Sequence, residues 1–217
     1  MSRFFEGRIF VKRFLCILLS MIFLLCIPVS VKAESNDEEV ITKQINTFMK
    51  AVKNYNPIKM DKCFKKPQRI YVTNAELRKL IKKMHKDTVY NITSINVSGK
   101  KAVVTIDYEY YSADDITYMA LQDSLNTYLR TKKFDFNKII KFIKKYYKDD
   151  CELHDDGMPT YCPTIKIQME KVKGKWKIKK CSKRLYNMTN HDIFATMDYL
   201  LSGTLNESSI FTLNEAA

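Results

Sequence analysis

Residues 165–178 alternate between apolar and polar side chains, and this period of two constrains the fold more than any other feature of the chain. Ile165, Ile167 and Met169 alternate with polar residues, and the alternation resumes at Trp176 beyond a Lys-Gly pair. Successive side chains of a strand point to opposite faces of a sheet, so one face of this segment is apolar and the other polar. A glycine-containing turn between two such runs predicts an antiparallel β-hairpin whose apolar face is covered.

A second hairpin is predicted earlier in the chain. Residues 94–110 also alternate, with Ile95 and Val97 before a Ser98-Gly99 turn and apolar residues at every second position of the run that follows it. Two hairpins with one polar face each indicate a half-covered antiparallel sheet.

The segments around the hairpins carry apolar residues three and four positions apart, which is the spacing of an amphipathic helix. These helices must cover the apolar side of the sheet. The predicted helical segments are 37–55 after an Asn36 cap, a short turn at 58–64, a helix capped by Thr73 and Glu76 that runs to Met84, two helices within 115–149 capped near Ser112 and at Asp135, and a last helix from Thr189 to Gly203. The fold class is therefore α+β, with two hairpins packed on an N-terminal helix, a helical insertion between the hairpins and a C-terminal helix.

Composition supports one globular domain. Of the 217 residues, 46% are hydrophobic and 12% are aromatic, which is enough to build a core, and only 5 Gly and 5 Pro argue against a loop-rich scaffold. Disordered, collagen-like and multi-span membrane classes are excluded. We expect a single domain over 34–203 and a flexible tail at 204–217.

The first 33 residues have the pattern of a secretory signal peptide. Basic residues precede the apolar run Phe14–Val31, and small or compact residues end it, so we predict cleavage between Ala33 and Glu34. The alternative is an uncleaved membrane anchor, because about 18 apolar residues nearly span a bilayer. Pro28 and the polar residues after the cleavage point favour removal. The protein is expected to be secreted or extracytoplasmic, and membrane-anchored if the leader is kept.

The chain is basic, with 37 Lys+Arg against 24 Asp+Glu and a formal net charge of +13. The basic residues are scattered as doublets, and Lys greatly outnumbers Arg. Proteins that read bases and phosphates favour Arg for its planar fork, so we expect no nucleic-acid partner. A solvated basic surface is the main interpretation, and weak attraction to anionic envelope polymers or a membrane surface is the alternative.

Four cysteines follow the predicted leader: Cys63, Cys151, Cys162 and Cys181. An even number is compatible with disulfides in an exported protein. Cys151 and Cys162 bracket a loop, so we predict that they pair and that Cys63 pairs with Cys181. Three or four free thiols are the alternative.

The sequence indicates no catalytic residues, no metal and no cofactor. Cys151 and His154 have a ligand-like spacing within an acidic loop, but no second close pair completes a tetrahedral set. His85 ends a Lys-rich helix and His191 starts a later one, so neither is expected in an apolar stripe that would perturb its pKa. Asp107 alternates with tyrosines and is expected on the opposite face of its strand.

The order of these elements is similar to a known family. An amphipathic N-terminal helix, a shorter second helical region, antiparallel hairpins and the closing pattern V-K-G-K-W-K-I at 172–178 resemble the exported branch of the nuclear transport factor two-like superfamily, which has a cystatin-like fold. The resemblance covers 37–55 and 88–182. It implies that the hairpins form a curved sheet that wraps the N-terminal helix into a cone.

The resemblance also bears on the function that we expect. Phe48, Tyr108, Tyr110 and Trp176 are candidates to line a pocket in the cone that binds a small apolar ligand, although in-facing aromatic residues are equally explained as core. Enzymes of this superfamily hold a carboxylate and a Tyr or His donor inside the cone, and no such pair assembles locally here. We therefore expect an exported, non-enzymatic binding or accessory domain with an unknown protein or small apolar partner. The alternative is a small-molecule isomerase or cyclase.

Overall fold

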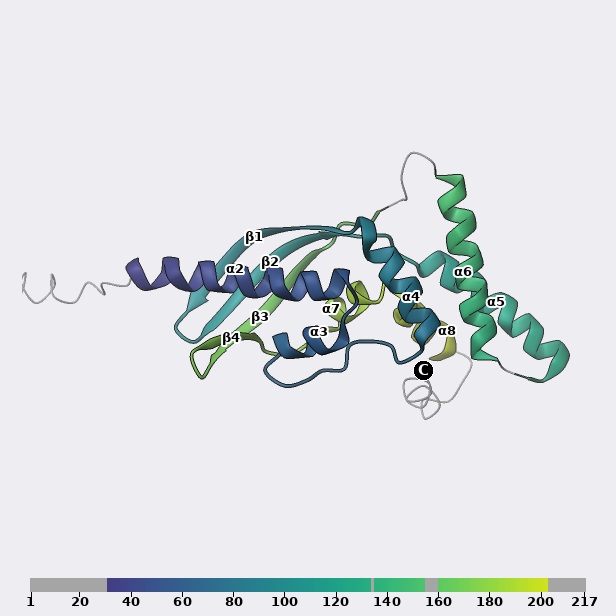
Figure 1. Cartoon of the computed structure of the whole chain (residues 1–217). Coiled ribbons are helices and arrows are strands. Elements are labelled where there is room, and N and C mark those ends of the chain that lie inside the picture. The colour runs from purple at the N-terminus through teal and green to yellow at the C-terminus, as the bar shows by residue number, and fades with distance from the viewer. Residues whose placement is uncertain (1–30, 134, 155–159, 203–217) are drawn as a thin grey trace, which may run out of the picture. The chain divides into compact units, whose positions relative to one another are not determined.

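A computed structural model describes residues 31–133, 135–154 and 160–202 (Figure 1). The chain divides into two units, residues 1–37 and 38–217, and the described part of the first unit lies within helix α2 (Val31–Lys53). Most of the predicted leader and the predicted tail at 204–217 lie outside the described residues. Within those residues, no helix combines the length and hydrophobicity that crossing a bilayer requires.

Four strands form one antiparallel sheet in the order β1-β2-β3-β4. They are β1 (Val89–Ser98), β2 (Lys101–Glu109), β3 (Thr164–Val172) and β4 (Lys175–Ile178). Both predicted hairpins are confirmed, because β1 pairs with β2 and β3 pairs with β4. Lys173 and Gly174 both have positive φ, 48° and 77°, as a two-residue hairpin turn of the mirror-image type requires.

The pairing of β2 with β3 joins the hairpins into one sheet. Val104 lies opposite Ile167, and Ile106 lies opposite Ile165. All four side chains are buried, whereas the residues between them in the strands are exposed or only partly buried. The sheet therefore has one apolar face, as the alternation predicts.

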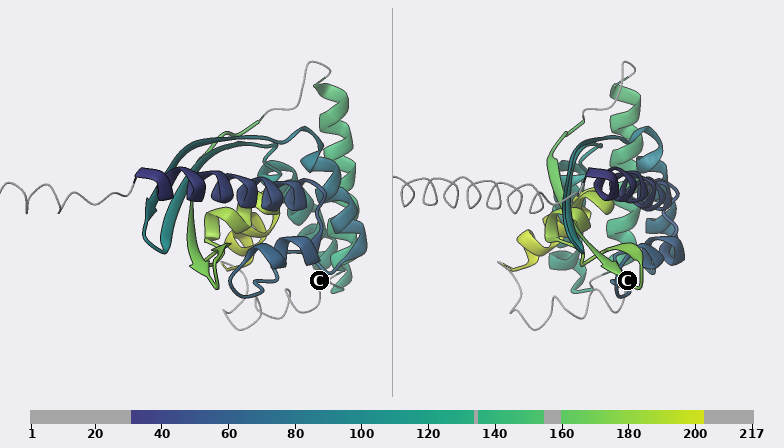
Figure 2. Two further views of the ribbon diagram at one scale, coloured as in Figure 1. Left: turned by 60° about the vertical axis from the view of Figure 1, so that its left-hand side comes forward. Right: turned by 90° about the vertical axis from the view of Figure 1, so that its left-hand side faces the viewer.

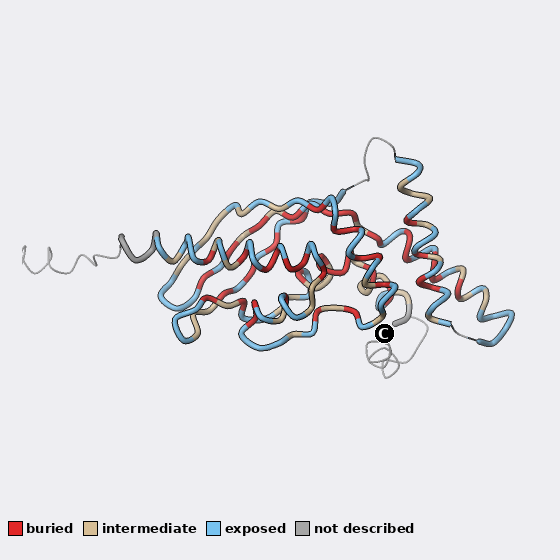
Figure 3. The backbone as a smooth tube through the Cα atoms, in the orientation of Figure 1, coloured by how far each residue is buried: buried red, intermediate tan, exposed pale blue. Residues whose placement is uncertain are grey.

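Helix α2 covers this face (Figures 1 and 2). Its residues Ile41, Ile45, Phe48 and Val52 form one stripe along the helix, and each is at most 1% exposed. The hydroxyl of Tyr90 in β1 donates to a side-chain oxygen of α2 at 2.9 Å. Figure 3 shows how buried and exposed positions alternate: buried positions recur along α2 and along the strands.

The remaining helices complete the α+β fold, and its predicted class is confirmed. They are α3 (Pro57–Cys63), α4 (Ala75–Met84), the 3-10 helix η1 (His85–Asp87), α5 (Asp114–Thr131), α6 (Phe136–Leu153), α7 (Lys183–Thr189) and α8 (Ile193–Ser202). The predicted helical insertion consists of α5 and α6, which pack against each other, and α8 packs against α5.

Several predicted boundaries are wrong. Helix α2 already includes Val31, so Asn36 lies inside the helix and does not cap it. The N-cap of α4 is Asn74, whose side chain accepts from two backbone N–H groups, so the cap lies one residue after the expected Thr73. Helix α7 was not predicted, and the last helix begins at Ile193 because α7 occupies the residues before it.

The edge of β4 is covered by the segment after α3. The N–H of Lys65 donates to the Ile178 carbonyl at 2.8 Å, and the Lys65 side chain forms an ion pair with Glu170. This contact places α3 next to β4.

We predict that Phe48→Ala lowers the free energy of unfolding by about 3–5 kcal/mol, because it removes a fully buried ring and leaves a cavity. Phe48 is 0% exposed, and its ring meets that of Phe64 edge to face at a centroid distance of 5.5 Å. Ile58→Ala is the control, because Ile58 is 69% exposed and its removal is expected to change stability by less than about 0.5 kcal/mol. Urea denaturation followed by circular dichroism measures both. Equal losses in the two variants would contradict this core.

Candidate functional site

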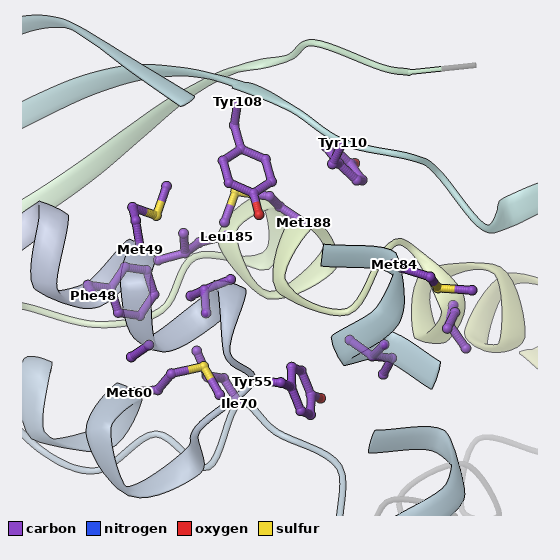
Figure 4. Close-up of a cluster of buried hydrophobic side chains, with 14 of the residues drawn as sticks. Phe48, Met49, Tyr55, Met60, Ile70, Met84, Tyr108, Tyr110, Leu185 and Met188 are labelled. Carbon is purple, nitrogen blue, oxygen red and sulfur yellow. The ribbon is translucent and has the colours of Figure 1, made fainter. Parts of the chain in front are cut away.

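The four predicted pocket residues lie in the hydrophobic core. Phe48, Tyr108, Tyr110 and Trp176 are each at most 3% exposed and belong to one cluster of buried side chains. Figure 4 shows Phe48, Tyr108 and Tyr110 among other buried side chains from helices and strands. In the described part of the chain, none of the four lines the lysine-rich cavity between α2 and α3. Their packing agrees with the core interpretation.

The predicted disulfides Cys151–Cys162 and Cys63–Cys181 are not present, because all four cysteines are free. The thiol groups of Cys63 and Cys181 contact carbonyl oxygens of their own segments, at 3.3 Å and 3.4 Å. Cys151 interacts with Tyr147 one turn earlier in α6. The structure agrees with the alternative, in which all four of these cysteines are free thiols.

The prediction that neither His85 nor His191 lies in apolar surroundings is wrong. His85 and His191 are both 0% exposed, and their ring centroids lie 4.2 Å apart. His154 is partly exposed at the end of α6, 3.6 Å from a carboxylate oxygen of Asp150. A signal for His85 exists in the sequence, since it lies four residues after Ile81 and eight after Leu77, on their buried stripe. His191 has no comparable local signal.

Hydrogen bonds fix the tautomers of the buried pair. His85 Nε2 lies 2.9 Å from the Thr189 carbonyl, and His191 Nδ1 lies 2.6 Å from the Tyr111 carbonyl. A carbonyl only accepts, so both of these nitrogens carry hydrogen. His85 Nδ1 is then an acceptor for the Tyr108 hydroxyl at 3.3 Å. Within the described residues, His191 Nε2 is buried without a hydrogen-bond partner.

The segment after α7 completes this buried polar cluster. The Tyr55 hydroxyl donates to the Asn190 side chain at 2.6 Å, and Asn190 donates in turn to the Ile70 carbonyl. His191 and Asp192 both have positive φ, 52° and 61°, which is a costly conformation for residues other than glycine.

Burial lowers the pKa of both histidines. The pKa of His85 lies well below its usual value because the ring is desolvated and His191 is close, and the pKa of His191 falls to about 4 because the ring is desolvated. Burial also raises the pKa of the Tyr55 and Tyr108 hydroxyls. At neutral pH the cluster is therefore a set of uncharged donors and acceptors.

A lysine-rich cavity lies away from this cluster, between α2 and α3. Its volume is about 800 Å³. Five lysines from α2, α3, α4 and β4 line it, and we call it the lysine cavity: Lys50, Lys59, Lys62, Lys82 and Lys177. The polar side chains of its wall are Gln44, Thr47, Asn54 and Asn56. No acidic, arginine or aromatic residue lines it in the described part of the chain.

The five cavity lysines have no acidic partner among the described residues. The ion pairs there involve other lysines, such as Lys65 with Glu170 and Lys144 with Glu76. Lys177 donates to the carbonyl of Lys62, which ties β4 to the end of α3. Cations gathered around one hollow attract anions. The described residues contain no group of three or more His, Cys, Asp or Glu that is arranged to hold a metal.

Comparisons with known proteins identify no family. The sequence matches no family model and no curated protein. One solved structure that matches is the crystal structure of the "putative lipoprotein (ycdA)" from Bacillus subtilis, with 13% sequence identity and a TM-score of 0.33. The match covers 54% of this chain and 38% of that chain.

We predict that the histidine pair makes the protein less stable in acid. A histidine with a lowered folded pKa binds fewer protons when folded, so the free energy of unfolding falls as pH drops below 6.5, by about 1.4 kcal/mol per pH unit for each histidine. For His191 the fall levels off near pH 4, its folded pKa. Urea denaturation between pH 7.5 and 4.5 measures the slope.

His191→Asn tests the assignment, because asparagine tolerates the positive φ of this residue and does not titrate. In this variant we expect the fall in the free energy of unfolding with decreasing pH to be smaller by about 1.4 kcal/mol per pH unit, which is the contribution of one histidine. The control His154→Asn removes the histidine at the end of α6, which is not part of the buried pair. A loss of slope in the control alone would contradict the assignment.

Thiol reactivity gives a further prediction. Burial raises the pKa of the Cys63 thiol and raises that of Cys181 to about 12, whereas Cys162 is exposed. Because the thiolate is the reactive form, we expect alkylation of the folded protein at Cys162 first and at Cys63 and Cys181 last. Timed alkylation with peptide mapping measures the order. Faster labelling of Cys63 than Cys162 would contradict the structure, and a disulfide-linked peptide under non-reducing conditions would restore the pairing prediction.

Proposed function

We propose that this protein is an exported, non-enzymatic binding domain that holds an anionic ligand in the lysine cavity. The observation that carries the proposal is the contrast between two regions. The aromatic residues of the core are packed against one another, whereas five lysines without acidic partners among the described residues surround a hollow of about 800 Å³. Ligand sites are concave and carry a few convergent polar groups, which is what the lysine cavity offers.

The fold supports this proposal by analogy. A curved sheet with a long N-terminal helix over its apolar face is what the resemblance to the nuclear transport factor two-like superfamily implies (Figures 1 and 2). The closing pattern at 172–178 forms the β3–β4 hairpin, as that resemblance expects. Membership of the cystatin-like cone fold is part of the proposal, as is a single domain over 34–203. A fold of this kind hosts unrelated functions, so the site decides between them.

Export is the second part of the proposal. It rests on the basic and apolar composition of the first 33 residues, with cleavage between Ala33 and Glu34 and retention as a membrane anchor as the alternative. A basic domain outside the cytoplasmic membrane meets anionic envelope polymers and anionic lipid surfaces.

A second candidate function is a small-molecule isomerase or cyclase. The observation that favours it is the hydrogen bond between the Tyr108 hydroxyl and His85, a titratable donor and acceptor that face each other beneath the sheet. General acid–base chemistry needs such a pair within reach of a substrate. Both side chains are at most 1% exposed, so this function requires an opening that admits the substrate.

The export proposal predicts a mature N-terminus at Glu34. N-terminal sequencing of the protein recovered from its host measures this end. A mature chain that begins at Glu34 supports export and cleavage, a membrane fraction that retains Met1 supports the anchor, and a cytoplasmic protein with Met1 contradicts export altogether.

The binding proposal is tested with inorganic tripolyphosphate, a compact and highly charged probe. We expect saturable binding at low salt, and we expect the double substitution Lys50→Gln with Lys59→Gln to weaken it by about tenfold or more, since each lost ammonium removes a charge-assisted hydrogen bond. Isothermal titration calorimetry measures the affinity.

The matched control is Lys138→Gln with Lys141→Gln. Both lysines lie on the exposed side of α6, away from the lysine cavity, and the double substitution changes the net charge by the same amount. The control is expected to bind like the parent protein. Equal weakening by both pairs would show diffuse attraction to a basic surface, and no binding by the parent protein would contradict the proposal.

A further inference from the structure

We infer that the anion held by the lysine cavity is an extended polyol phosphate, a flexible chain of hydroxylated units joined by phosphodiesters. The inference rests on the proposed function, because it names the class of ligand for the same site. Four properties of the cavity wall carry it: its charge, its length, the residue types that it lacks and the hydrogen-bonding groups that it leaves unused.

The charge of the wall favours a ligand with more than one anionic group. Its five lysines repel one another across a shared hollow, and no acidic side chain lines it in the described part of the chain. A single phosphate neutralises at most two of these charges. An anion with several phosphates relieves the repulsion and releases the counterions that the lysines otherwise hold.

The length of the wall favours an extended anion. Helix α2 contributes residues from Gln44 to Ala51, and seven residues of helix rise about 10 Å. The lysines come from four elements around the hollow: Lys50 from α2, Lys59 and Lys62 from α3, Lys82 from α4, and Lys177 from β4, where it donates to the Lys62 carbonyl. A ligand that meets all of them must carry its phosphates at intervals.

The residue types that the wall lacks argue against nucleic acid. Bases are read by the planar fork of arginine or stacked on aromatic rings. In the described part of the chain, the cavity is lined by neither. Lysine instead holds phosphate as a point charge and accepts a flexible backbone in many conformations.

The neutral side chains of the wall fit hydroxyl groups. The Asn54 amide donates to the Lys50 carbonyl, which leaves its oxygen available, and the Asn56 oxygen accepts from Lys59 N–H, which leaves its amide hydrogens available. Thr47 donates to a carbonyl within α2 and keeps its acceptor capacity. Hydroxyls both donate and accept, so they satisfy this mixed set better than a bare polyphosphate, which only accepts.

The test compares three probes on the full chain: inorganic tripolyphosphate, an oligomer of glycerol phosphate with as many phosphates as the cavity has lysines, and an oligothymidylate with the same number of phosphates. We expect the glycerol phosphate oligomer to bind at least about tenfold more tightly than the oligothymidylate at equal salt. Binding of the glycerol phosphate oligomer should also weaken steeply as salt rises.

Gln44→Met separates hydroxyl recognition from charge, because methionine keeps the length of the side chain and removes its hydrogen bonds. Gln44 is partly buried in the cavity wall. We expect this variant to bind the glycerol phosphate oligomer about three- to tenfold more weakly and tripolyphosphate with unchanged affinity. Thr47→Val is a second variant of the same kind and is expected to show the same selective loss.

The outcomes separate this inference from the proposed function. If tripolyphosphate binds but Gln44→Met and Thr47→Val affect neither probe, the cavity is an anion site that does not read hydroxyls, and the inference fails alone. If the oligothymidylate binds as tightly as the glycerol phosphate oligomer or more tightly, the ligand class is wrong. If no probe binds, both the inference and the proposed function fail.

Discussion

The pairing of β2 with β3 is the contact on which the rest of the domain depends. It joins two hairpins that are separated in the chain by α5 and α6, so forming it carries the entropic cost of closing a long connection. Burial of Val104, Ile106, Ile165 and Ile167 on one face offsets that cost. Without this shared face α2 has no surface to cover, and α3 loses the β4 edge that holds it next to α2.

Hydrogen bonds link the polar groups inside the domain. His85, His191, Tyr108 and Asn190 bring together η1, β2 and the segment after α7, and most of their polar atoms are hydrogen-bonded. Buried polar groups cost free energy unless they are paired, so a network of this kind selects one arrangement of the elements around it. The backbone strain at His191 is tolerated because its surroundings hold it in place. The five lysines that line the lysine cavity do not belong to this network. They come from α2, α3, α4 and β4.

The sequence predicts the parts of this structure that depend on local patterns. The β3–β4 hairpin follows from strict alternation and a Lys-Gly turn, and the stripe of α2 follows from its spacing. Helix α7 was not predicted because seven residues show no clear period and, unlike the equally short α3, it has no proline in its first turn to mark its start. The lysine cavity was not predicted for another reason: Lys177 is far in the chain from Lys50 and Lys59, and each lysine alone looks like a solvated surface residue. His191 is buried by tertiary contacts that no local pattern encodes.

The central claim is that ligand binding takes place at the lysine cavity and leaves the aromatic core undisturbed. Amide chemical shifts of the labelled protein, recorded during titration with the glycerol phosphate oligomer, test it most directly. We expect the largest shifts at the cavity residues Lys50, Lys59, Lys82 and Lys177, with little change at Tyr108, Tyr110 and His191. Shifts concentrated around Tyr108 and His85 would place the ligand inside the domain and contradict the account.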